Sequence, residues 1–208
     1  MNYEVLYTFC FATAALAISP GPDNIYVMMQ SLVNGKKYGM ATLAGLISGC
    51  LIHTSLLAFG VSALIKENDE LFFVIKLLGA IYLFYLAYKV YRSEVSLNVS
   101  SEGVPKKSMW ALFRQGFVMN VLNPKVTIFF LAFFPGFLFS NELSTVWQFY
   151  ILGGLFMVVS FIIFSGIALL AGSISTYFTK QAKAGVFLKW LQIVVFVGIA
   201  IYILLSDN

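Results

Sequence analysis

Six long apolar stretches recur along the chain, and each is long enough to cross a lipid bilayer as a helix. They cover approximately residues 5–33, 38–65, 70–92, 109–139, 143–174 and 186–205. A hydrocarbon core about 30 Å thick needs about 20 apolar residues per helix, so six such helices nearly exhaust the 208 residues. Only 11% of the residues are charged, against about 25% in soluble domains. The sequence predicts an all-α integral membrane protein with six transmembrane helices and excludes a nucleic-acid-binding domain.

The basic residues predict which loops face the cytoplasm, because Lys and Arg are retained on that side of the membrane. Ten of the 13 basic residues lie at the connections that follow the first, third and fifth stretches. These ten are Lys36, Lys37, Lys89, Arg92, Lys106, Lys107, Arg114, Lys180, Lys183 and Lys189. We therefore expect three cytoplasmic loops, with both termini outside.

One long polar connection, at about residues 93–108, divides the chain into repeat one at about 1–92 and repeat two at about 109–208. Each repeat holds three apolar stretches. Since three crossings end on the opposite side of the membrane, the two repeats have inverted orientations. We therefore expect a single transmembrane transporter domain over residues 1–208, built from two inverted three-helix repeats.

The first stretch of each repeat is interrupted near its middle, so helices 1 and 4 are predicted to break at mid-membrane. The interrupting residues are Pro20, Gly21, Pro22, Asn123 and Pro124. Proline removes a backbone donor and cannot continue a regular helix, so the freed groups need a cavity lined by protein or water. Pro124 alone is also compatible with a simple kink. Inverted repeats with broken first helices are typical of transporters, whose substrate binds where the broken helices meet.

Three ionisable side chains, Asp23, His53 and Lys125, lie deep in the apolar stretches. At a rise of about 1.5 Å per residue, all three fall in one layer near the membrane centre. A charge there costs about 2.5–3.5 kcal/mol, so we expect this layer to be functional. Asp23 suits the ammonium of a small zwitterion and Lys125 its carboxylate, while Asn24 and Asn123 orient either group.

Other roles for these residues stay open. Asp23 and Lys125 can form a permanent buried ion pair, which is weak as a packing device, or Asp23 can be a proton-coupling site. His53 is either a proton carrier or a hydrogen-bond partner of a neighbouring helix.

Small residues in the second stretch predict close helix packing. Gly45-xxx-Gly49 permits a close approach, and Thr42 and Ser48 are placed to add hydrogen bonds between helices. The phenylalanines that follow Lys125 are interpreted as core or lipid-facing rather than as a substrate cage. They are Phe129, Phe130, Phe133 and Phe134.

Several functional classes lack their sequence signatures. No phosphate loop, HExxH motif or Cys/His cluster with metal-ligand spacing occurs, so we expect no cofactor and no metal site. A thiol-transfer enzyme would need cysteines at corresponding positions of both repeats, whereas Cys10 and Cys50 both lie in repeat one. The sequence therefore predicts a protein that is not an enzyme.

Several motifs together resemble the lysine exporter superfamily, and in particular its homoserine/threonine-resistance branch. The first is Ser-Pro-Gly-Pro-Asp-Asn at 19–24, followed by Gly-Lys-Lys-Tyr-Gly at 35–39. The others are Gly-Cys-Leu-Ile-His-Thr at 49–54, Gly-Ala-Ile-Tyr at 79–82 and Asn-Pro-Lys at 123–125. The resemblance covers almost the whole chain.

The resemblance implies an amino-acid exporter of the bacterial inner membrane that is driven by proton antiport and is compatible with a homodimer. Its partners are then the amino acid, protons and the lipid bilayer. The resemblance does not name the amino acid. The alternative within the same superfamily is a cation or metal exporter that uses Asp23.

Overall fold

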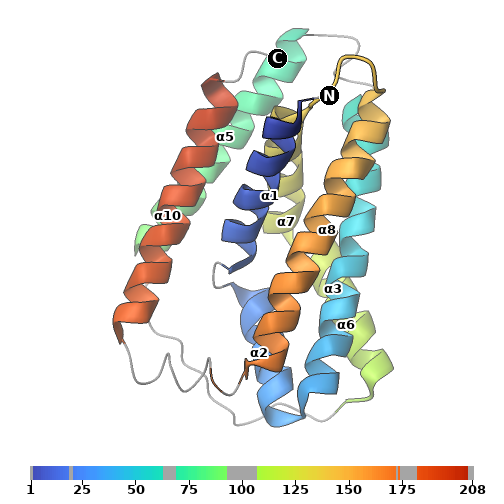
Figure 1. The fold of residues 1–208 in the computed structure, drawn as a ribbon, viewed down its shortest axis with the longest axis vertical. Coiled ribbons are helices and arrows are strands. Elements are labelled where there is room, and N and C mark those ends of the chain that lie inside the picture. The colour runs from blue at the N-terminus through green and yellow to red at the C-terminus, as the bar shows by residue number, and fades with distance from the viewer. Residues whose placement is uncertain are drawn as a thin grey trace.

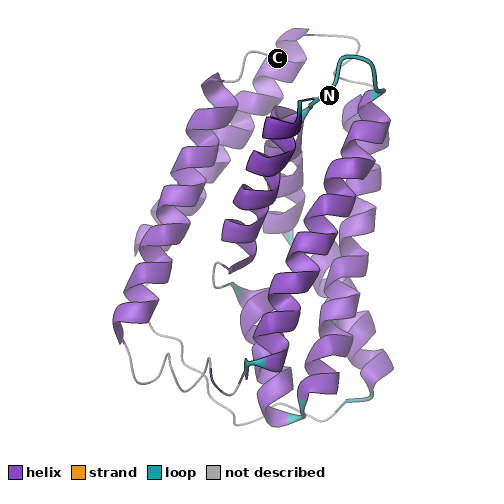
Figure 2. Cartoon of the chain, viewed as in Figure 1, coloured by secondary structure: helices purple, strands orange, loops and turns teal. Residues whose placement is uncertain are grey.

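All regular elements in the described part of the chain are helices, as Figure 1 and Figure 2 show for this computed structural model. The described residues are 2–18, 21–62, 69–92, 107–171, 173 and 182–205. Their α-helices are α1 (Tyr3–Ile18), α2 (Pro22–Val33), α3 (Lys36–Leu56), α5 (Asp69–Arg92), α6 (Met109–Val121), α7 (Pro124–Phe133), α8 (Thr145–Leu169) and α10 (Ala182–Leu205). A π-helical turn, η1 (Leu57–Val61), extends α3, and a 3-10 turn, η2 (Phe134–Phe137), extends α7. The all-α prediction is confirmed for these residues.

Three stretches are long and apolar enough to cross a membrane. They are Lys36–Val61, which joins α3 and η1, Phe73–Arg92 within α5, and Thr145–Leu169, which is α8. The pair of α1 and α2 is a fourth candidate, bent by 56° at its break. Lys189–Leu205 of α10 is apolar but shorter, and α6 and α7 have 13 and 10 residues. The described residues thus contain three to four candidate spans, and the six-span count stays a prediction.

The helices form one elongated bundle in which two helices are each replaced by a stacked pair. In Figure 1, α3 and α8 run along most of its length, whereas α1 stands above α2 and α7 stands above α6. Both breaks therefore lie near the middle of the bundle. On one flank, α5 and α10 pack side by side. The start of α1 and the end of α10 lie at the same end of the bundle.

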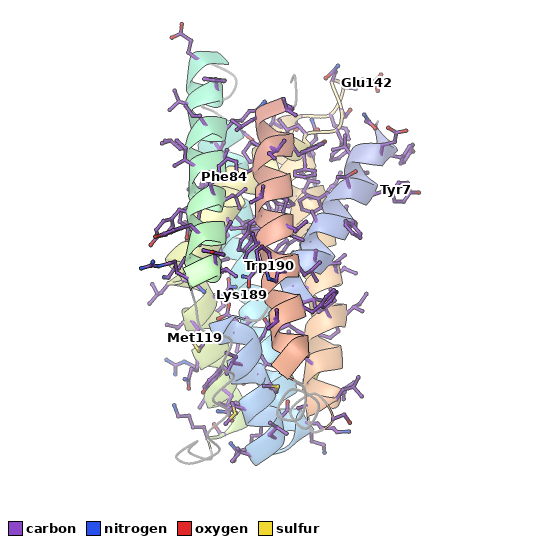
Figure 3. The ribbon with its side chains drawn as sticks, turned by 90° about the vertical axis from the view of Figure 1, so that its left-hand side faces the viewer. Tyr7, Phe84, Met119, Glu142, Lys189 and Trp190 are labelled. Carbon is purple, nitrogen blue, oxygen red and sulfur yellow. The ribbon has the colours of Figure 1, made fainter. Side chains whose placement is uncertain are left out.

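The outside of the bundle is apolar along much of its length. Tyr7 of α1, Phe84 of α5 and Trp190 of α10 project outward in Figure 3 and are exposed. Many other large apolar side chains on α3, α5, α8 and α10 are exposed as well. Exposed apolar surface of this extent is covered by a partner or by lipid. Together with the candidate spans, it defines a multi-pass membrane protein.

Aromatic side chains fill the core between α1 and α7. The phenylalanines after Lys125, for which the sequence left core and lipid-facing positions open, are buried in this core. Phe9 of α1 lies 5.1 Å from Phe133 between ring centroids, and Phe130 lies 4.3 Å from Phe134. At such distances aromatic pairs stabilise one another beyond the area that they bury. The cluster joins α1 to α7 on one side of the two breaks.

Close contact between α3 and α6 depends on glycines, as Gly45-xxx-Gly49 predicted. A Cβ atom built on Gly45 would overlap the backbone carbonyl of Phe113 in α6, and one on Gly116 would overlap the carbonyl of Thr42 in α3. The two backbones are therefore in direct contact, and small residues are required on both helices.

The predicted hydrogen bonds between helices from Thr42 and Ser48 are wrong. The Thr42 hydroxyl donates to the carbonyl of Tyr38 at 3.0 Å, and the Ser48 hydroxyl donates to the carbonyl of Ala44 at 2.7 Å. Both bonds stay within α3, because the hydroxyl of a helical Ser or Thr can bond to the carbonyl four residues earlier.

Gly45→Ala tests the close crossing of α3 and α6. Because the new Cβ meets backbone rather than a movable side chain, we expect a loss of about 1–3 kcal/mol of stability and a lower melting temperature of the purified protein. Gly154→Ala is the matched control, since a Cβ at Gly154 meets nothing within 4 Å. Equal melting temperatures for the two variants would contradict the proposed contact.

Candidate functional site

The break between α1 and α2 is closed by a side-chain hydrogen bond. Gly21 adopts an extended conformation at the N-cap of α2, with φ −147° and ψ 174°, and Pro22 begins the helix, where its missing N–H is not needed. The Asn24 side-chain amide donates to the carbonyl of Ala17 at 2.9 Å. This bond satisfies one of the carbonyls that the end of α1 leaves without a helical partner.

The break between α6 and α7 is closed from a neighbouring helix. The carbonyl of Asn120, in the last turn of α6, accepts from the backbone N–H of Asn123 at 3.0 Å. It also pairs with Nε2 of His53 in α3 at 3.1 Å. Because a carbonyl only accepts, Nε2 carries the hydrogen in this pair. The carbonyl of Asn123 in turn accepts from the N–H groups of Val126 and Thr127 in α7.

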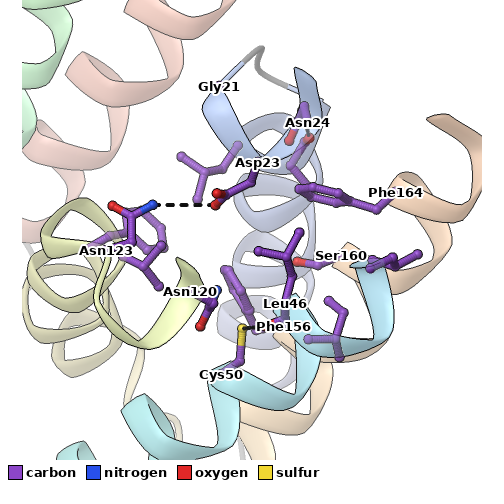
Figure 4. A pocket seen from close by; sticks show the side chains of 16 residues that line it. Gly21, Asp23, Asn24, Leu46, Cys50, Asn120, Asn123, Phe156, Ser160 and Phe164 are labelled. Carbon is purple, nitrogen blue, oxygen red and sulfur yellow. Dashed lines mark hydrogen bonds between the residues drawn. The ribbon is translucent and has the colours of Figure 1, made fainter. Parts of the chain in front are cut away.

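The two breaks meet through Asp23 and Asn123, which are 100 residues apart in the sequence. The side-chain amide of Asn123 donates to Oδ2 of Asp23 at 3.5 Å, a long hydrogen bond that Figure 4 shows across the site. Asp23 lies in the first turn of α2, where the positive end of the helix dipole favours a carboxylate. The contact places one acidic side chain between the two broken helices.

A cavity of about 100 Å³ opens at this contact, which is room for a small molecule rather than a single water. Its polar lining comes from Asp23, Asn24, Asn120, Asn123 and Ser160 (Figure 4). The rest of the lining is mainly apolar: Leu16, Ala17, Leu43, Leu46, Ile47, Val126, Phe129, Phe156 and Phe164, with Gly21 and Cys50. An apolar cavity with a few polar groups is the usual form of a small-molecule site. A single carboxylate in such a cavity is suited to bind an ammonium group.

Four of the residues that the sequence singled out line this cavity, namely Gly21, Asp23, Asn24 and Asn123. Pro20 lies outside the described residues. The backbones of Pro22, Pro124 and Lys125 belong to α2 and α7, while their side chains lie outside the described part of the structure.

His53 lies behind the cavity wall. Its side chain is 3% exposed, its ring centroid lies 5.4 Å from that of Phe130, and it is not among the lining residues. Through the bond to the carbonyl of Asn120, it holds the end of α6 in place. A role of His53 in carrying protons stays a prediction.

Sequence reasoning did not single out Asn120, Ser160, Phe156 or Phe164 as site residues. It interpreted Phe129 as a core or lipid-facing residue rather than part of a substrate cage, whereas Phe129 is buried and also lines the cavity. Asn120 precedes Asn123 by one helical turn, so the two side chains were candidates for a shared face. Ser160 is a polar residue within the long apolar run of α8. Phe156 and Phe164 flank Ser160 one turn on either side and were not distinguishable from other apolar residues of this helix.

The apolar helices, the two breaks and the cavity between them define a class of protein. It is a multi-pass helical membrane protein with a small-molecule cavity at two helix breaks, as in transporters. A protein family described as LysE type translocator matches residues 14–207. The chain therefore belongs to the LysE family of translocators, which are transporters and not enzymes.

Relatives of known function are similar over most of the chain. A homoserine/homoserine lactone efflux protein of Salmonella typhimurium is 30% identical over 186 residues, which cover 88% of this chain and 89% of the relative. A leucine efflux protein of Salmonella choleraesuis is 29% identical over 189 residues, which cover 89% of this chain and 87% of the relative. No solved structure matches the chain.

Asn24→Leu tests whether the side-chain cap of α1 supports the site. It leaves the buried carbonyl of Ala17 without its donor, so we expect stability to fall by about 1–3 kcal/mol, measured as a lower melting temperature in detergent. The control is Asn34→Ala at the other end of α2, where the side chain donates to Oε1 of Gln30 instead of to a carbonyl at the break. A control that melts as low as Asn24→Leu would show that the break does not depend on this cap.

Proposed function

We propose that this protein is a secondary active exporter of amino acids or close derivatives, and that the substrate binds where the two broken helices meet. The observation that carries the proposal is the contact of Asp23 with Asn123 at the edge of a mostly apolar cavity. The relatives named for homoserine and for leucine efflux support an amino acid as the substrate.

The lining residues suit the two ends of an amino acid. Asp23 binds the ammonium, and such charge-assisted hydrogen bonds are stronger than neutral ones, especially where water is largely excluded. The substrate carboxylate lies toward the first turn of α7, whose helix dipole presents its positive end directly after Asn123. Lys125, predicted from the sequence to hold this carboxylate, belongs to the same turn. Phe156 and Leu46 contact the hydrocarbon part of the substrate.

The carboxylate of Asp23 also provides a route to proton antiport. Asp23 holds either a proton or the ammonium of the substrate, but not both at once. An exporter that releases the amino acid outside therefore returns with a proton on Asp23, and the proton gradient drives net export. His53, if it carries protons, would do so next to Asn120 rather than in the cavity itself.

The proposed architecture is one transporter domain over residues 1–208, with six membrane spans in two inverted repeats and both termini outside the inner membrane. The two broken pairs, α1 with α2 and α7 with α6, support it, because each is interrupted near mid-height (Figure 1). The start of α1 and the end of α10, at one end of the bundle, fit an even number of crossings. A homodimer stays a prediction of the family resemblance.

No observation favours the alternative of a cation or metal exporter. Within the described residues, no group of three or more His, Cys, Asp or Glu side chains gathers to hold a metal ion. The amino acid is therefore the substrate that we propose.

Asp23→Asn tests the substrate site and the coupling together. The purified protein is placed in vesicles preloaded with labelled homoserine or leucine, with a pH gradient that is acidic on the receiving side. We expect wild-type export to accelerate with the gradient and Asp23→Asn to lose at least about tenfold of that rate, because removing a charge-assisted bond of about 1.5–3 kcal/mol has that effect.

The matched control is Glu142→Gln, which neutralises an exposed carboxylate in the loop before α8 and is expected to keep the wild-type rate. Wild-type rates in Asp23→Asn would contradict the proposed site. If the wild-type export rate does not depend on the pH gradient, proton antiport is contradicted but the proposed substrate site is not.

A further inference from the structure

The cavity extends from the two breaks mainly toward one end of the bundle. In α8 its lining begins at Phe156, and none of the described residues from Thr145 up to that ring belongs to it. In α3 the lining runs from Leu43 to Cys50 and stops short of η1. The cavity therefore lies mainly in the half of the bundle that holds α2, below the breaks in Figure 1. That half leads to the connection at Lys36, which the basic residues predict to be cytoplasmic.

Aromatic rings fill the opposite half, between the cavity and the end at which α1 begins. We define the outer aromatic cluster as Phe9 of α1, Phe130 and Phe133 of α7, and Phe134 and Phe137 of η2. Each of these side chains is at most 1% exposed. The ring centroid of Phe9 lies 5.1, 5.2 and 5.4 Å from those of Phe133, Phe134 and Phe137. The cluster thus closes the space between α1 and α7.

The cavity borders directly on this cluster. Phe156 of α8 lines the cavity, and its ring centroid lies 4.9 Å from that of Phe130 and 5.9 Å from that of Phe134. Phe129 of α7 also lines the cavity, and its ring stacks on Phe133 at 4.6 Å. A molecule in the cavity is therefore separated from the far end of the bundle by aromatic rings.

The joint between α1 and α7 differs in kind from the joint between α3 and α6. At Gly45 the backbones of α3 and α6 touch, whereas those of α1 and α7 stand further apart and phenyl rings bridge the gap. In the part of the chain that the structure describes, no hydrogen bond joins α1 to α7. The bond from the N–H of Asn2 to the carbonyl of Phe139 lies beyond both helices, and Asn2 is exposed, so water can replace this bond.

Such a joint can open at low cost in polar contacts. Apolar contact is non-directional, so rings that part leave no donor or acceptor without a partner. Both α1 and α7 end or begin at a break, and element ends of this kind are where hinges occur. The two outer helices can therefore move apart while α3 and α6 stay together as a scaffold.

Resting on the proposed function, we propose that the outer aromatic cluster is the gate between the substrate cavity and the outside. The structure then corresponds to the state in which this gate is closed and the cavity belongs to the cytoplasmic side. An amino acid enters the cavity from the cytoplasm while the rings are together. Its release requires α1 and α7 to separate at Phe9, which opens the cavity outward.

The test measures from which side of the membrane a cysteine in the cavity can be reached. The reference protein carries Val126→Cys with Cys10→Ser and Cys50→Ser, because Val126 lines the cavity, is partly exposed and is close to cysteine in size. A charged, membrane-impermeant methanethiosulfonate reagent is added to right-side-out or to inside-out membrane vesicles. The rate of modification is followed by mass spectrometry. We expect the reference protein to react faster in inside-out vesicles, where the reagent is on the cytoplasmic side.

Phe9→Ala in this reference protein removes the central ring of the gate. Because the lost contacts exist only in the closed state, we expect the ratio of the outside rate to the inside rate to rise at least about tenfold. Phe11→Ala is the matched control on the same helix, since Phe11 is 76% exposed, and it is expected to keep the reference ratio. Phe9→Leu is the second variant if Phe9→Ala fails to accumulate, with a smaller rise in the same direction.

Three results would overturn the gate. The first is a reference cysteine that reacts faster from outside or from neither side. The second is a ratio that Phe9→Ala and Phe9→Leu leave unchanged. The third is an equal increase from both sides, which would make Phe9 an ordinary core residue whose loss loosens the whole bundle.

The labelling requires no substrate, so the gate and the proposed function can fail separately. If the ratio rises as expected but the wild type exports no amino acid, the proposed function fails and the closure of the cavity by the aromatic cluster stands. If amino-acid export depends on Asp23 but the ratio does not change, the gate is wrong and the proposed function stands.

Discussion

Lipid offers no hydrogen bonds, so every backbone group that a broken membrane helix leaves unpaired has to find a partner in the protein or in enclosed water. The two breaks of this chain are arranged around that constraint. The Asn24 side chain bonds to a carbonyl at the end of α1, and the His53 ring bonds to a carbonyl at the end of α6. Between them, Asp23 and Asn123 meet at 3.5 Å. The cavity thus lies where the backbone is least able to face lipid, and the polar side chains at the two breaks line it.

One face of α3 sets the position of the second break. Gly45, Gly49 and His53 follow one another at four-residue intervals, so they lie on the same side of the helix. Gly45 admits the backbone of α6, Gly49 admits the side chain of Asn120, and His53 binds its carbonyl. A change on this face therefore reaches the cavity through Asn120, although none of these three residues lines the cavity. The bond to the Asn120 carbonyl gives His53 a structural role.

The sequence predicted the parts of the site that are conspicuous in an apolar chain. Two prolines and a glycine cannot continue a helix, and Asp23 is costly at mid-membrane, so this break and its acid could be located without a structure. Asn120 and Ser160 were not predicted, because a polar side chain in an apolar helix can face its own backbone, a neighbouring helix or a cavity. Thr42 shows the first of these outcomes, contrary to expectation. Which face meets the cavity depends on how the helices pack, and helical periodicity does not fix that.

The central claim is that the exported amino acid occupies the cavity at the two breaks, whose wall includes Asp23. The most direct test is equilibrium binding of a labelled exported amino acid to the purified wild type and to Asp23→Asn. The account predicts saturable binding to the wild type and a Kd at least about tenfold higher for the variant, because a charge-assisted hydrogen bond is lost. Equal affinity of the two proteins would contradict it.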